Sequence, residues 1–73
     1  MKALTQLLLS HIRGASGLTN AMLAGHLDSE LKKLTCPQIQ QLVAICQAEK
    51  DRCQDDEDVA RTAEWLIAEL ACY

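Results

Sequence analysis

Leucine residues recur every three or four positions along most of this chain, and this spacing constrains the fold more than any other feature of the sequence. The clearest run places leucine at positions 23, 27, 31 and 34. Such a period gathers apolar side chains on one face of an α-helix, whereas a half-buried strand requires strict alternation. Twelve leucines and ten alanines stand against two valines and no phenylalanine, which argues against a β-domain. The 49% hydrophobic content also excludes a disordered chain.

Helix-breaking and helix-capping residues divide the chain into four predicted helices, over residues 2–13, 19–34, 36–53 and 57–72. Gly14 and Gly17 interrupt the first periodic segment. Thr35, Pro37 and Gln38 form the strongest start signal, because Thr35 and Gln38 have the spacing of a capping box and proline is tolerated in the first helical turn. The predicted buried positions are Leu4, Leu7, Leu8 and Ile12, then Leu23, Leu27, Leu31 and Leu34, then Ile39, Leu42, Val43 and Cys46, and finally Val59, Ala63, Leu66, Ile67 and Leu70.

We therefore expect residues 1–73 to form a single all-α domain, a compact bundle of about four short helices. The last two helices are nearly equal in length and joined by a short turn, so we expect them to form an antiparallel hairpin. Residues 19–34 are taken as one helix, with Gly25 or Asp28 and Ser29 as places where it could break. A chain of this size buries only about 60% of the surface that it exposes when unfolded. Self-association would supplement so thin a core, and we expect a homodimer.

Charge is spread unevenly over the two halves of the chain. Residues 1–35 hold four basic and two acidic residues, whereas residues 36–73 hold three basic and eight acidic ones. Carboxylates crowd around the expected hairpin turn, at Glu49, Asp51, Asp55, Asp56, Glu57 and Asp58. Acids at the start of a helix stabilise its dipole, and turns are solvated, which is one explanation. The other is a patch that recruits a protein partner with a basic surface, through Asp55, Asp56 and Asp58. The acids lack the spacing and the glycine of a calcium loop.

Trp65 does not fit the amphipathic pattern of the last predicted helix. It aligns with Arg61 and Glu69 rather than with the leucines, so it either packs under a neighbouring helix or is exposed as an anchor for a partner. Arg61 lies one turn earlier and could stack on the indole. Leu9 is a second misfit, on the side of the first helix. Trp65, Arg61, Glu69 and Leu9 therefore join the three aspartates as candidate partner-binding residues.

The four cysteines suggest neither a metal site nor a set of disulfides. No Cys-x-x-Cys pair occurs, and Cys46 and Cys53 lie two helical turns apart, about 10 Å, too far for one bridge. Free thiols in a reducing cytosol are expected. The hairpin would place Cys36 and Cys72 at the same level, at its open end. We therefore expect Cys36–Cys72 to form before any bridge to Cys46 under mild oxidation.

Catalysis is not expected, and neither a cofactor nor a metal is implied. Ser10 and His11 are adjacent, so on a helix they point about 100° apart and cannot act as nucleophile and base. His11 is expected at the edge of the apolar face. The sequence contains no glycine-rich phosphate loop. No apolar stretch approaches the ~18 residues of a membrane span.

The sequence thus favours a soluble, cytoplasmic protein-binding module that regulates or inhibits a partner stoichiometrically, in the manner of small bacterial or phage accessory proteins. A helix-turn-helix transcription regulator is the alternative, with the break near Gly25 to Asp28 and with Lys32 and Lys33 facing phosphates. Nucleic acid is not expected as a partner, because an acidic chain has few cations to neutralise phosphates. A redox-sensitive thiol protein is the third possibility.

Overall fold

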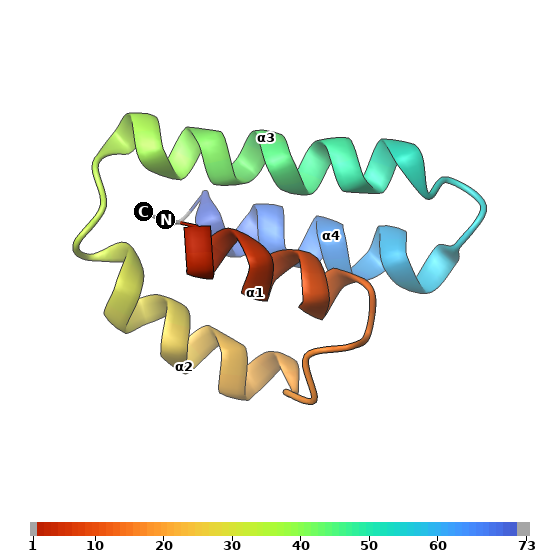
Figure 1. Ribbon diagram of the computed structural model, residues 1–73, viewed down its shortest axis with the longest axis horizontal. Coiled ribbons are helices and arrows are strands. Elements are labelled where there is room, and N and C mark those ends of the chain that lie inside the picture. Colours follow the sequence, from red (N-terminus) through yellow and green to blue (C-terminus); the bar gives the residue numbers. More distant parts are fainter. Residues whose placement is uncertain (1, 72–73) are drawn as a thin grey trace.

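The computed structural model describes residues 2–71, and over these residues it contains four helices and no strand. Helix α1 spans Lys2–Ile12, α2 spans Asn20–Leu31, α3 spans Cys36–Arg52 and α4 spans Glu57–Leu70. Figure 1 shows α3 and α4 as an antiparallel pair, α1 lying against both, and α2 on the side away from α3. Helices α1 and α3 run in the same direction. The predicted all-α bundle and its C-terminal hairpin are confirmed.

Side chains at the helix starts explain why the elements begin where they do. The Thr35 side chain accepts from the backbone of Gln38 and the Gln38 side chain accepts from the backbone of Thr35, which completes the predicted capping box of α3. Thr19 caps α2 by accepting from the N–H of Met22 at 3.2 Å. Gly14 and Gly17 take φ values of 76° and 73°, a conformation that side chains with a Cβ rarely adopt, and they form the loop between α1 and α2.

Helix α2 differs from the prediction at its C-terminal end. It stops at Leu31 rather than at Leu34, because the N–H groups of Lys33 and Leu34 bond three residues back and close the last turn. Thr35 then takes the extended conformation that its capping role in α3 requires. The helix continues without a break through Gly25, so the interruption that a helix-turn-helix needs between Gly25 and Asp28 is absent.

The core lies between the four helices and consists mainly of leucine. Its buried members are Leu8, Ile12, Leu23, Leu27, Leu31, Ile39, Leu42, Cys46, Val59, Ala63, Leu66 and Leu70. All of them stand at positions that the periodicity predicts as buried. Five further residues that the periodicity predicts as buried are only half-buried and pack against the edge of this core: Leu4, Leu7, Leu34, Val43 and Ile67. Periodicity therefore predicts more buried positions than the structure fully encloses.

Candidate protein-binding surfaces

The turn between α3 and α4 carries the acidic residues that the sequence singles out. Asp55, Asp56, Glu57 and Asp58 are all exposed. Asp56 is the N-cap of α4, and one of its carboxylate oxygens accepts from the N–H groups of Asp58 and Val59 at 3.0 and 3.2 Å. Glu57 and Asp58 lie in the first turn, where their charge favours the helix dipole. Asp56 therefore has a structural role that Asp55 does not share.

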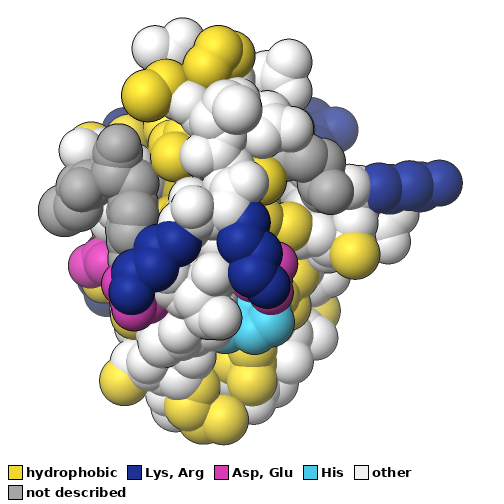
Figure 2. Space-filling model, turned by 90° about the vertical axis from the view of Figure 1, so that its left-hand side faces the viewer, with side chains coloured by type: hydrophobic (Ala, Val, Ile, Leu, Met, Phe, Trp, Pro, Cys, Tyr) yellow, Lys and Arg dark blue, Asp and Glu magenta, His cyan; other side chains and the backbone are white. Residues whose placement is uncertain are grey.

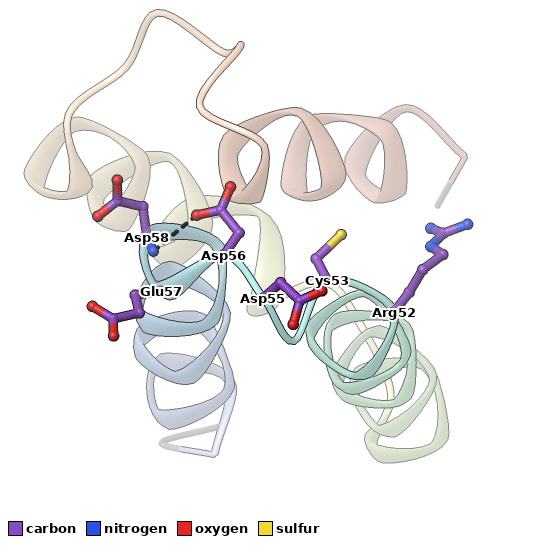
Figure 3. A pocket seen from close by; sticks show the side chains of 6 residues that line it. All are labelled: Arg52, Cys53, Asp55, Asp56, Glu57 and Asp58. Atoms are coloured by element: carbon purple, nitrogen blue, oxygen red, sulfur yellow. Dashed lines mark hydrogen bonds between the residues drawn. The ribbon is translucent and has the colours of Figure 1, made fainter.

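These side chains line an open hollow together with Arg52 and Cys53. Figure 3 shows that they do not converge: Asp55 lies beside Cys53, whereas Glu57 and Asp58 point away on the other side. Within residues 2–71 no three His, Cys, Asp or Glu side chains come together as metal ligands. The hollow is a charged surface rather than an enclosed pocket.

Glu49 is not part of this exposed cluster, which corrects the grouping made from the sequence. Its side chain is only 2% exposed and lies between α1 and α3. Arg13 donates from Nε to Oε1 at 2.9 Å and from Nη2 to Oε2 at 3.3 Å, and Arg52 donates to Oε2 as well. The hydrogen bonds from Arg13 hold the pKa of Glu49 below its usual value, against the opposing effect of burial. The carboxylate therefore stays charged and ties the end of α1 to α3.

The candidate residues of α4 form one stripe that continues from the acidic turn. Asp58, Arg61, Trp65 and Glu69 follow one another at spacings of three and four residues, and so lie on one side of the helix. Asp58 and Arg61 form an exposed ion pair of 4.0 Å. Trp65 is half-buried and packs against the core, so part of its indole remains at the surface. The side chain of Trp65 is thus neither fully packed under a neighbouring helix nor fully exposed.

His11 is the ring neighbour of Trp65, with centroids 5.9 Å apart and planes tilted by 49°. The Nε2 atom of His11 lies 2.7 Å from Asn20 Oδ1, and because an amide oxygen can only accept, Nε2 is the donor. The Nδ1 atom lies 2.9 Å from Ser16 Oγ. Ser16 Oγ also accepts from the N–H of Leu18. The buried imidazole thus fastens the loop and the start of α2 to α1, and it holds Trp65 from one side. The sequence placed His11 at the core edge but gave no signal for Ser16 or Asn20 as partners.

Leu9 lies apart from the α4 stripe. It is half-buried, does not belong to the core, and lines a shallow hollow with Gln6, Ser10 and Arg13. The most exposed large hydrophobic side chain among the described residues is Met22 of α2, at 57%. The structure therefore places Asp58, Arg61, Trp65 and Glu69 along one side of α4, next to the turn that carries Asp55 and Asp56, whereas Leu9 lies on α1 and lines a separate hollow.

The opposite end of the molecule carries basic side chains. Lys32 and Lys33 are exposed where α2 leads to α3, and Lys32 pairs with Asp28 at 3.3 Å. Figure 2 views this end and shows that basic side chains lie beside a histidine and beside acidic side chains, with hydrophobic atoms at several separate places. This end therefore carries charges of both signs, whereas the turn between α3 and α4 exposes four consecutive acidic residues, residues 55–58.

The cysteines remain unpaired among the described residues. Cys46 is buried, which raises the pKa of its thiol to about 11, whereas Cys36 is exposed. Cys36 and Ala71 line the same hollow at the open end of the hairpin. Cys72 lies outside the described residues, so the Cys36–Cys72 bridge stays a prediction.

Comparison with known proteins adds no relative: no family model matches the chain, and neither a curated protein nor a solved structure is significantly similar to it. Among the described residues, no helix has the length and apolar character needed to cross a bilayer.

Proposed function

We propose that this protein is a binding module that acts stoichiometrically on a partner protein, as a regulator or inhibitor. The observation that carries the proposal is the continuous α4 stripe of Asp58, Arg61, Trp65 and Glu69, which joins the exposed acids of the turn. Tryptophan and arginine are enriched among the residues that dominate the binding energy of protein interfaces. His11 holds the indole from behind, so a partner would meet an aromatic side chain that is already positioned.

The expected partner has a basic surface. Asp55 and Glu57 are exposed, and neither carboxylate forms an ion pair or hydrogen bond with another described residue. Together with Asp58 they attract positive charge and would speed encounter with such a surface. Asp56 contributes charge too, but its capping bonds make it a poor residue for testing recognition.

Self-association belongs to the proposal. The core is small, and Met22 and Leu9 keep apolar surface outside it. A cytoplasmic setting fits the three cysteines that are unpaired within residues 2–71, because thiols stay reduced there.

The experiment captures proteins from a lysate of the source cells on the immobilised chain and identifies them by mass spectrometry. We expect one partner in a stoichiometric complex, measured by light scattering after gel filtration. Replacing Asp55, Glu57 and Asp58 by Asn, Gln and Asn should weaken its capture, and so should added salt. A matched control replaces Lys32 and Lys33 by Gln at the far end and should leave capture unchanged. Equal capture by both variants would contradict the acidic surface, and the absence of any stoichiometric partner would contradict the function.

A further inference from the structure

His26 and Glu30 form a pair of potential metal ligands that the binding surface described above does not use. They stand four residues apart on α2, so both side chains project from the same side of the helix, with Cβ atoms about 5–6 Å apart. Both line one hollow between α1 and α2, which Ala3, Leu4 and Leu7 of α1 also line. His26 is exposed and Glu30 is half-buried. The pair is therefore accessible from solvent and borders apolar surface.

Their chemistry suits zinc. Imidazole nitrogen and carboxylate oxygen are both zinc ligands, and two side chains four residues apart on a helix have the spacing that chelates this ion in known helical sites. Neither side chain forms a hydrogen bond or ion pair with any other described residue. Asp28 of α2 pairs with Lys32, the residue that follows the helix. Within residues 2–71 the two ligands are thus not engaged by competing contacts.

Two ligands make only half of a site, because zinc in proteins is almost always bound by four ligands in a tetrahedron. No third His, Cys, Asp or Glu side chain within residues 2–71 joins this pair. A second copy of the chain supplies two more ligands if the copies meet about a two-fold axis that passes between His26 and Glu30. In such an arrangement each His26 faces the Glu30 of the other copy, since a two-fold interface pairs the same patch with itself.

We propose that His26 and Glu30 are a zinc half-site, completed by the same two residues of a second copy. Met22 lies one turn before His26 on the same side of α2, and its exposed side chain would enter the contact around the metal. The bound ion carries two positive charges, and the two Glu30 carboxylates neutralise them. This inference gives an interface to the self-association proposed above, and it rests on that part of the proposed function.

The test compares the molecular mass in EDTA with the mass after addition of one zinc ion per two chains, by light scattering at micromolar concentration under reducing conditions. The 8.1 kDa chain is expected to double its mass with zinc and to return on chelation. His26→Ala and Glu30→Gln should each abolish the doubling. Ser29→Ala, an exposed neighbour on α2, is the matched control and should keep it. A variant with Cys36, Cys53 and Cys72 replaced by serine separates this site from zinc binding by thiols.

The outcomes distinguish this site from self-association as such. Doubling that survives His26→Ala and Glu30→Gln, or that is lost with the three cysteines, would overturn the proposed ligands. If the chain is already dimeric in EDTA, zinc binding is measured by titration calorimetry instead of by mass. Binding of one zinc ion per dimer that is lost in His26→Ala then supports the site. If the dimer binds no zinc, the proposed site is wrong, whereas self-association is still supported. A chain that is monomeric in EDTA and dimeric with zinc would restrict self-association to the metal-bound state.

Discussion

Truncation of Leu42 tests the assignment of the core most directly, because α3 offers a matched control three residues away. Leu42 is 0% exposed, whereas Ile45 is half-buried and lies outside the core. Leu42→Ala removes three buried carbon groups, about 2.4 kcal/mol at about 0.8 kcal/mol each. The cavity left behind brings the expected cost into the range of about 2–5 kcal/mol. A domain of this length has about 4–11 kcal/mol of stability in total, so this one change removes a large part of it.

Ile45→Ala should cost less than Leu42→Ala, about 1–2 kcal/mol, because part of the Ile45 side chain is already in water and alanine is the better helix former. Urea unfolding followed by circular dichroism measures both free energies. Leu42→Met, which conserves volume, should cost less than about 1.5 kcal/mol and shows that the site tolerates change when it stays filled. Equal costs for Leu42→Ala and Ile45→Ala would refute the assignment of the buried face of α3.

Three further predictions concern charge. Glu49 has a lowered pKa in the folded state, so the stability it contributes is full above its unfolded value of about 4.5 and is lost as pH falls through the lower folded value. The difference in unfolding free energy between the native chain and Glu49→Gln should therefore be constant near neutral pH and shrink in acid; a pH-independent difference would contradict this. Asp56→Ala should lower the free energy of unfolding by about 1 kcal/mol, because it removes the cap of α4. Asp55→Ala, the control, should lower it by less than about 0.5 kcal/mol. Urea unfolding measures both, and equal losses would contradict the capping role of Asp56. No sequence-selective DNA complex is expected in gel-shift assays, and one that disappears when Lys32 and Lys33 are replaced by alanine would contradict the prediction.

Local sequence rules predicted the helices because their starts and stripes depend on nearby residues. The capping box of Thr35 and Gln38 involves residues three apart, and its two partners are fixed once that segment is helical. The end of α2 was predicted three residues too late for a related reason. Leu34 keeps the leucine spacing, but the chain must leave the helix before Thr35 so that Thr35 can cap α3. Periodicity indicates which side of a segment is buried and says less about where the helix stops.

The ion pair between the exposed Arg13 and the buried Glu49 was missed because it depends on tertiary contacts. Arg13 and Glu49 are 36 positions apart, and only the parallel packing of α1 on α3 brings them together. A signal was nonetheless present: Glu49 stands seven residues after Leu42 and three after Cys46, on the same helical face as the core. A carboxylate at such a position must find a cation if it is to be buried. Arg13, which follows the first helix, was available for that role.

The functional surface is harder to predict than the core because folding constrains outward-facing residues only weakly. Burial must offset conformational entropy, so every core position is restricted to apolar side chains of suitable size, whereas an exposed position tolerates most residues. Evidence of function therefore comes from outward residues that folding does not explain. Trp65 is only half explained, since His11 and the core cover part of its ring, and Met22 is not explained by packing at all. Each stands one helical turn from a polar residue of definite chemistry, Arg61 in one case and His26 in the other. For this reason α4 and α2 are the two helices whose exposed sides the proposed experiments probe.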